Sequence, residues 1–227
     1  MRFYIDSADR EVARPLLSTG VFAGLTTNPT LLRTAGVANR DIAALVGWAT
    51  AAGARTVFVQ AWGADAQALE ASGRAIREFG PNIVVKVPAT RDGIQVTARL
   101  ESAEIPVLVT AVHEASQVLP AMAAGAHFVA PYLGRMNDAG RDGYAEIAAM
   151  QRVIDTSGSE LQILVASLRT PADAMRLAEI GVRHFTLSPK VWDRFFDDEL
   201  TATAVHAFED AAAKGHRHRA PDHSGEG

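Results

Sequence analysis

The amino-acid sequence predicts an α/β protein, a (β/α)8 TIM barrel that carries an extra C-terminal helix. Eight short runs rich in β-branched and aromatic residues alternate with segments of helical spacing, whereas an open doubly wound sheet usually has five or six strands. No glycine-rich fingerprint follows the first run, which disfavours a dinucleotide-binding fold. No linker rich in Pro, Gly or Ser divides the 227 residues, so we expect one domain.

The first half of the chain is expected to hold four strands, each followed by a helix. The strands are short apolar runs, and the helices place apolar side chains on one face, as Val12, Leu16 and Leu17 do. The pair Asn28-Pro29 predicts a turn after the second strand. The expected elements are, in order, strand Phe3–Asp6, helix Asp9–Ser18, strand Phe22–Thr26, helix Asp41–Ala52, strand Thr56–Ala61, helix Asp65–Phe79, strand Ile83–Val87 and helix Asp92–Ala103.

The second half repeats the same alternation. Gly125 and Gly181 are placed to end two helices, and Pro171 is placed to begin one. The expected elements are strand Val107–Ala111, helix His113–Ala124, strand His127–Ala130, helix Tyr144–Ser157, strand Gln162–Ser167, helix Pro171–Ile180 and strand His184–Leu187.

Two further segments, Lys190–Phe196 and Leu200–Lys214, have helical composition. The second carries an apolar stripe that would pack either on its own barrel or on a neighbouring subunit. We therefore expect a single barrel domain over residues 1–213, including the C-terminal helix, and a polar, mobile tail over residues 214–227. The histidines of that tail are not expected to form a functional metal site.

Composition narrows the function classes. A formal charge of −4 gives no basic field for nucleic acid, and the absence of cysteine excludes disulfides, thiolate catalysis and cysteine-ligated zinc. The N-terminus lacks the long apolar core of a signal peptide, and no run of about 18 apolar residues occurs. These features predict a cytoplasmic protein with neither a nucleic-acid nor a membrane partner.

Lys86 lies in the otherwise apolar run Ile83–Pro88. Burying an ammonium costs free energy, and the chain has only two other lysines, Lys190 and Lys214, so a general excess of lysine does not explain its position. A neutral buried amine is the nucleophile of Schiff-base enzymes. The alternative is a structural lysine that reaches solvent or pairs with a carboxylate.

Polar residues end seven of the eight predicted strands. In a TIM barrel the chemistry lies at these carboxyl ends, so the residues there are the candidate site. One carboxylate, one lysine and several amides and hydroxyls suit carbonyl chemistry on a polyhydroxylated substrate. The residues are Asp6, Thr26, Asn28, Gln60, Lys86, Thr110, Tyr132, Arg135, Ser167 and Arg169.

Four collinear motifs carry a resemblance to the transaldolase family. They cover roughly residues 1–213, and the chain length is similar to that of the short members of this family. The motifs are TTNPTLL at 26–32, VVKVPAT at 84–90 followed by Asp92-Gly93, APYLGR at 130–135, and ASLRTP at 166–171 followed by AEIG at 178–181.

The resemblance implies a Schiff-base aldol enzyme that needs no metal and no organic cofactor. Lys86 matches the nucleophilic lysine, and Asp6 matches the carboxylate that moves protons at the substrate hydroxyl. Thr26 and Asn28 match residues that orient the sugar and the amine. Arg135, Ser167 and Arg169 match the region that holds the sugar phosphate, which agrees with the bidentate geometry of guanidinium and phosphate.

Two positions indicate the branch of the family. Gln60 and Tyr132 stand where transaldolases carry a glutamate and a phenylalanine, and together they resemble the fructose-6-phosphate aldolase branch. There Tyr132, Gln60 and Thr110 would hold a water and share in proton transfer, and a glutamine cannot act as a general base. Gly134 instead resembles the transaldolases, so the donor and acceptor sugars stay open.

Each residue also has a structural alternative. Asp6 could cap the following helix, Asn28 could only form a turn, Tyr132 could be a core residue, and either arginine could be a solvated charge. His113 is expected near the mouth of the barrel, in the first turn of a helix.

The sequence therefore predicts a class I aldolase that cleaves or forms the C3–C4 bond of a ketose phosphate such as fructose 6-phosphate. The alternatives are a transaldolase that transfers the dihydroxyacetone unit and a non-catalytic barrel that binds a sugar phosphate. A metal-dependent aldolase is disfavoured because no His/Asp cluster lies at the strand ends. By resemblance, a homo-oligomer is also expected, a decamer of two pentameric rings.

Overall fold

The computed structural model describes residues 1–216, and it confirms the predicted (β/α)8 barrel with an extra C-terminal helix. Eight parallel strands close in sequence order, because β8 pairs with β1 as well as with β7. The chain divides into two compact units, the barrel unit Met1–Trp192 and a C-terminal unit that begins at Asp193. The expected tail lies, from residue 217 onward, outside the described residues.

The strands are four to six residues long and buried on both faces, as parallel strands covered by helices are. They are β1 Arg2–Asp6, β2 Phe22–Thr26, β3 Thr56–Gln60, β4 Ile83–Pro88, β5 Val107–Val112, β6 Phe128–Pro131, β7 Gln162–Val165 and β8 His184–Leu187.

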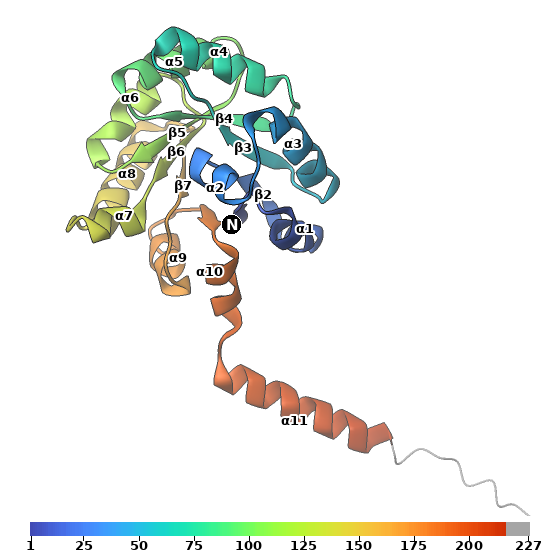
Figure 1. The fold of residues 1–227 in the computed structure, drawn as a ribbon. Helices are drawn as coiled ribbons and strands as arrows, with labels where there is room; N and C mark the ends of the chain where they lie inside the picture. The colour runs from blue at the N-terminus through green and yellow to red at the C-terminus, as the bar shows by residue number, and fades with distance from the viewer. Residues whose placement is uncertain (217–227) are drawn as a thin grey trace, which may run out of the picture. The chain divides into compact units, whose positions relative to one another are not determined.

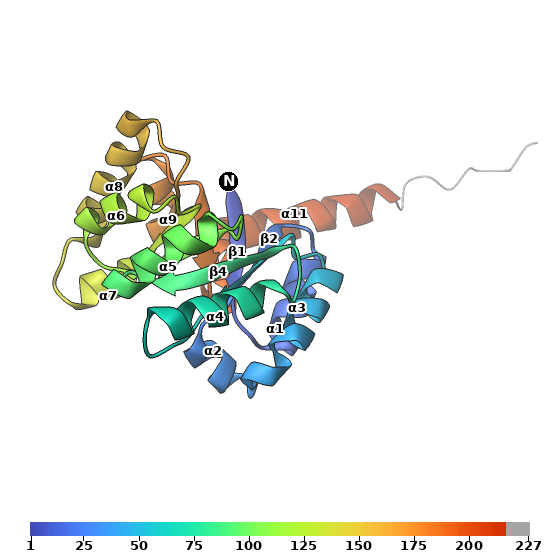
Figure 2. The ribbon, with the colours of Figure 1, turned by 90° about the horizontal axis from the view of Figure 1, so that it is seen from above.

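The helices of the barrel unit surround the strands, and α4 and α5 lie side by side over β4 in both ribbon views (Figures 1 and 2). They are α1 Arg10–Ser18, α2 Pro29–Thr34, α3 Ile42–Ala51, α4 Ala66–Arg77, α5 Arg91–Glu101, α6 Val118–Ala123, α7 Leu133–Asp138, α8 Gly143–Ser157, α9 Pro171–Ala178 and α10 Pro189–Asp193, with 3-10 turns at Asn39–Asp41 and Ala115–Gln117. The C-terminal unit holds the 3-10 turn Arg194–Phe196 and helix α11 Glu199–His216. Among the described residues, no helix is both long and apolar enough to cross a membrane.

Four local differences from the sequence expectation follow the carboxyl ends of the strands. The turn expected at Asn28-Pro29 opens a short helix, α2, which Asn28 caps, and a second short helix, α7, follows Tyr132 directly. The strand expected to reach Ser167 ends at Val165, because Ser167 has a left-handed backbone, with φ +61°. The single helix expected over His113–Ala124 is a 3-10 turn followed by α6.

Two apolar clusters hold the barrel together. One lies between the strands and the surrounding helices. The other fills the barrel interior, with one buried residue from each of the first seven strands, so the barrel is a packed core and not a pore. These interior residues are Tyr4, Ala23, Phe58, Val84, Leu108, Ala130 and Leu164.

The eighth strand completes the interior with His184, which is only 5% exposed. Its Nδ1 lies 3.2 Å from the hydroxyl oxygen of Tyr4. Burial, together with the positive charges of Arg2, the N-terminal amine and Arg183, lowers the pKa of His184 to about 4. Because the unfolded chain takes up this proton near pH 6.5, the free energy of unfolding should fall as the pH drops from about 6.5 to about 4, by about 3 kcal/mol in total.

Substituting His184 should flatten this pH dependence. We expect His184→Asn to reduce the loss of stability between pH 6.5 and 4, measured by urea unfolding at several pH values. His127→Asn is the matched control, because His127 is an exposed histidine bound to Glu101. An unchanged pH slope in His184→Asn would show that other groups dominate the acid sensitivity.

Candidate active site

A cavity of about 230 Å³ lies at the carboxyl ends of the barrel strands. Its lining includes eight of the ten residues expected from the sequence: Asp6, Thr26, Asn28, Lys86, Tyr132, Arg135, Ser167 and Arg169. A larger hollow at the amino ends of β6–β8 mixes arginine, histidine and acidic side chains. Since TIM-barrel chemistry lies at the carboxyl ends of the strands, the smaller cavity is the candidate active site.

Lys86 is the buried amine of this cavity. It is 5% exposed, and its Nζ donates a 2.7 Å hydrogen bond to the carbonyl oxygen of Thr27. Thr27 is itself fixed, because its backbone N–H and its hydroxyl both donate to the carbonyl oxygen of Phe58 on β3. The amine is therefore oriented by backbone of neighbouring strands and faces the cavity.

Asp6 ends β1 beside this amine. Burial raises the pKa of its carboxyl, and Lys86, the hydrogen bond from Thr26 and Arg135 oppose the shift. The cap of helix α1 is Asp9, whose Oδ1 accepts from the N–H of Glu11, so the capping role considered for Asp6 falls to another residue. A carboxyl with a raised pKa is suited to take up and return a proton.

Two threonines hold the Asp6 carboxylate in place. The hydroxyl of Thr26 donates to Oδ1 of Asp6 over 2.7 Å and lies 2.5 Å from the hydroxyl of Thr186 on β8. Because Thr26 uses its single proton toward Asp6, Thr186 is the donor to Thr26. Thr186 and Ser188 line the cavity but were not among the residues expected from the sequence. Their signal was the alternation His184, Thr186, Ser188, which places all three on the inner face of the barrel.

Asn28 lines the cavity and also caps helix α2. Its Oδ1 accepts from the N–H groups of Thr30 and Leu31, both at 3.0 Å, and so caps α2. The amide nitrogen is the part of this side chain left to act toward the cavity.

Tyr132 is part-buried and follows β6 at the cavity wall. Its hydroxyl lies 2.9 Å from the hydroxyl of Thr110 on β5, and the guanidinium of Arg135 lies 5.0 Å from its ring centre. Thr110 is buried and does not line the cavity itself, so it reaches the site through Tyr132.

Gln60 is placed differently from the other expected residues. It pairs in register with Lys86 across β3 and β4, but it lines a neighbouring hollow of about 510 Å³ together with Trp62 and Arg91. Its backbone is therefore close to Lys86, while its side chain lies outside the wall of the candidate cavity.

The two expected arginines lie where α7 meets the end of β7. The N–H of Gly134 donates to the carbonyl oxygen of Ser167 over 2.9 Å. A Cβ at position 134 would lie 2.4 Å from that oxygen and 2.6 Å from Nε of Arg169, so only glycine permits this approach. Arg169 also forms a 2.8 Å ion pair with Asp138.

Within residues 1–216, no group of three or more His, Cys, Asp or Glu side chains is arranged to hold a metal ion. The polar groups of the cavity are one amine, one carboxylate, hydroxyls, an amide and two guanidinium groups. This set can bind an anionic, hydroxylated molecule and move protons beside a nucleophilic amine.

Solved structures of other proteins share the fold of this chain. A mandelate oxidase variant (TM-score 0.55, 15% identity) and a flavocytochrome b2 variant (TM-score 0.59, 12% identity) superpose on 82% and 83% of this chain. The chain spans 63% and 57% of these two structures, and the likeness concerns the fold alone.

Sequence comparison shows the family to which this TIM barrel belongs. The family described as Transaldolase/Fructose-6-phosphate aldolase matches residues 3–223, and this protein belongs to it. Similar relatives include a "Probable transaldolase" of Caulobacter vibrioides, 35% identical over 95% of this chain and 98% of its own length. Another, from Phenylobacterium zucineum, is 32% identical over 92% of this chain and 94% of its own length.

Proposed function

We propose that this protein is a class I aldolase that cleaves or forms the C3–C4 bond of fructose 6-phosphate or a similar ketose phosphate. The observation that carries the proposal is the buried Lys86 amine in a cavity that also holds Asp6 and Tyr132. The substrate class follows from the two arginines at the cavity wall and from the family to which the chain belongs.

In the proposed reaction the neutral amine of Lys86 attacks the C2 carbonyl of the ketose. Loss of water then gives an iminium, which accepts the electron pair of the C3–C4 bond as that bond breaks. The proton of the C4 hydroxyl passes to Asp6 or to a water bound by Tyr132, and the aldehyde product leaves. Protonation of the remaining enamine, followed by hydrolysis of the iminium, releases dihydroxyacetone and restores the amine.

Transaldolase activity is the second candidate. In that reaction the enamine adds to a second aldose instead of being protonated. Gly134 favours it, because this glycine resembles the transaldolases, and so do the names of the relatives. Gln60 and Tyr132 favour the aldolase, because a glutamine cannot replace the glutamate that works on water.

One assay separates these functions. Purified protein is incubated with fructose 6-phosphate, alone and with a second aldose phosphate, and both three-carbon products are measured. Release of dihydroxyacetone and glyceraldehyde 3-phosphate without an acceptor supports the aldolase. Turnover only with the acceptor supports the transaldolase, and turnover in neither case supports a sugar-phosphate-binding barrel.

Removing the Arg135 guanidinium should weaken phosphorylated substrates selectively. We expect Arg135→Ala to raise KM for fructose 6-phosphate by about 10- to 100-fold, as loss of a charged hydrogen bond does, and to leave KM for dihydroxyacetone as donor within about threefold. Steady-state kinetics with both donors check this. Arg169→Ala should act in the same direction, and Arg99→Ala, which removes a pair with Glu70 on the barrel exterior, is the control. Equal effects on both donors would place the phosphate elsewhere.

We also propose that the protein acts in the cytoplasm as a homo-oligomer, with a decamer of two pentameric rings as the state that the family resemblance implies. Helix α11 supports an assembly, because Leu200 and Phe208 are 80% and 71% exposed. An apolar helix face of this kind is typically covered by a partner.

A further inference from the structure

The end of β5, just before the loop to α6, has a strained backbone close to Tyr132. Ala111 has φ +58°, a left-handed conformation that is unfavourable for any residue with a side chain. The pairing of β5 with β6 is irregular at the same place, between Val109 and Val112. Such strain persists only where the surrounding structure enforces it, and it is concentrated at functional sites.

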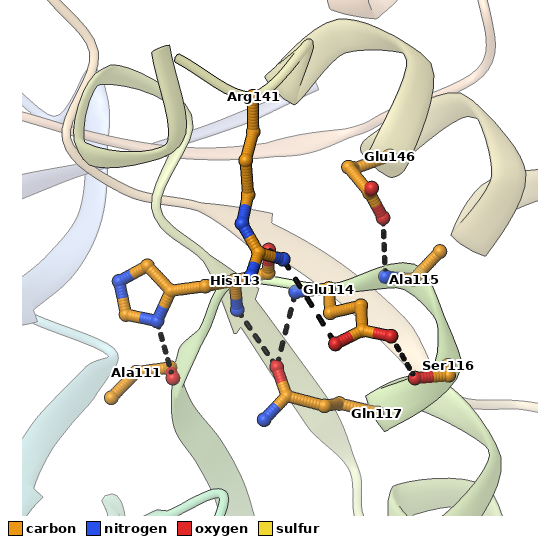
Figure 3. A network of polar contacts seen from close by, with 8 residues as sticks. All are labelled: Ala111, His113, Glu114, Ala115, Ser116, Gln117, Arg141 and Glu146. Carbon is orange, nitrogen blue, oxygen red and sulfur yellow. Dashed lines mark hydrogen bonds and ion pairs between the residues drawn. The ribbon is translucent and has the colours of Figure 1, made fainter. Parts of the chain in front are cut away.

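Three side chains hold this loop in place (Figure 3). Oε1 of Gln117 accepts from the backbone N–H groups of His113 and Glu114, at 2.8 and 3.1 Å. Arg141 donates to the carbonyl oxygen of His113 over 3.0 Å, and the carboxylate of Glu146 on α8 accepts from the N–H of Ala115. These contacts involve only the loop backbone, so they do not depend on the identity of residue 113.

Two contacts do depend on a histidine at position 113. Its Nδ1 lies 2.9 Å from the carbonyl oxygen of Ala111, the strained residue, and a carbonyl can only accept, so Nδ1 carries the proton. Its ring meets the ring of Tyr132 edge to face, with centroids 5.4 Å apart and planes at 68°. Figure 3 shows the imidazole turned away from the polar contacts that fix the loop backbone.

The hydroxyl of Tyr132 lies 2.9 Å from the hydroxyl of Thr110. The hydroxyl oxygen lies on the Cβ–Cγ axis of the side chain, so only rotation about the Cα–Cβ bond displaces it, and a neighbouring ring packed against Tyr132 opposes that rotation. The imidazole packs against this ring, and its Nδ1 bond to Ala111 fixes the imidazole in turn. The left-handed backbone of Ala111 therefore accompanies a carbonyl that points toward Nδ1 of His113 and accepts its proton.

We propose that His113 is a positioning residue that holds the Tyr132 ring so that its hydroxyl stays beside Thr110 and the cavity. This inference rests on the proposed function for its consequence in catalysis, and on the structure alone for the contact itself. The imidazole ring of His113 supplies the contact with the Tyr132 ring, and its Nδ1 proton, bonded to the carbonyl oxygen of Ala111, fixes the orientation of the imidazole.

The catalytic readout is a double-mutant cycle with Tyr132. We expect His113→Ala to lower kcat for fructose 6-phosphate cleavage by about three- to tenfold, the range of an edge-to-face aromatic pair, with KM changed less than twofold. His113→Phe, which keeps a ring but loses the Nδ1 bond to Ala111, should recover part of the loss. In a Tyr132→Phe background the effect of His113→Ala should vanish, because the hydroxyl to be positioned is gone. A loss that persists in that background, or an unchanged kcat in His113→Ala, would overturn the proposal.

A second readout does not need activity. The chain has three tyrosines, Tyr4, Tyr132 and Tyr144, so ring-labelled tyrosine gives an NMR spectrum that Tyr132→Phe assigns. His113→Ala should shift or broaden the Tyr132 ring signals and leave those of Tyr4 and Tyr144 in place, while His127→Ala, on an exposed histidine, should change none. An unmoved Tyr132 signal refutes the contact, whereas a moved signal in a protein without cleavage activity refutes only the proposed function.

Discussion

Replacing Lys86 with methionine is expected to reduce the cleavage of fructose 6-phosphate to the background rate, a loss of at least about 10⁴-fold in kcat. The reaction as proposed has no path without a covalent bond to this amine, since Lys86 is the one primary amine among the described residues that line the cavity. Methionine has a similar length and volume, so the packing of β4 should be retained. Loss of the 2.7 Å bond to the Thr27 carbonyl should lower the stability by only about 1 kcal/mol.

The measurement is the rate of aldehyde release together with the thermal midpoint of unfolding. Lys190→Met is the matched control, because Lys190 is an exposed lysine on α10. The control should keep full activity. If Lys86→Met retained more than about a tenth of the wild-type rate while folded, the amine would not be the nucleophile.

Removing the hydroxyl of Tyr132 should have the second largest effect. We expect Tyr132→Phe to lower kcat for aldol cleavage by about 10²-fold or more, the usual contribution of a positioned proton donor or acceptor. The hydroxyl bonds to Thr110, and the ring contacts of His113 and Arg135 stay available to phenylalanine. The loss should therefore be in the chemical step and not in folding.

Kinetics with and without an acceptor aldose check this prediction and report on the branch of the family. Tyr144→Phe is the control, because it removes a hydroxyl bound to Asp173, outside the cavity. Cleavage lost with transfer retained would show that Tyr132 serves the protonation of the enamine. No loss of either would make Tyr132 a structural residue and remove the argument for the aldolase branch.

Much of the fold and of the cavity lining could be predicted from the sequence because a parallel barrel is regular. Each strand is a short apolar run, and its carboxyl end must lie at the mouth, so a polar residue such as Asp6 or Lys86 at that end is brought to the cavity. The question of whether Asp6 caps α1 needed the structure. Asp9 lies three residues further on and has the extended backbone of a cap, with ψ 115°.

The parts that could not be predicted depend on contacts between distant segments. Helices α2 and α7 are six residues long, too short to show a helical period. The end of β7 depends on the left-handed backbone of Ser167, which the N–H of Gly134 helps to hold. Thr186 lies one residue before the apolar end of β8, Leu187, so the residue types at the strand ends do not indicate it, although it lines the cavity.

The most direct test of the account is reductive trapping. The protein is treated with fructose 6-phosphate or dihydroxyacetone and then with borohydride, which delivers a hydride to an iminium and leaves a stable secondary amine. Peptide mass spectrometry then locates the adduct among the three lysines of the chain. The account predicts a single adduct on Lys86, dependent on the sugar. An adduct only on Lys190 or Lys214, or none in a preparation that cleaves the substrate, would contradict it.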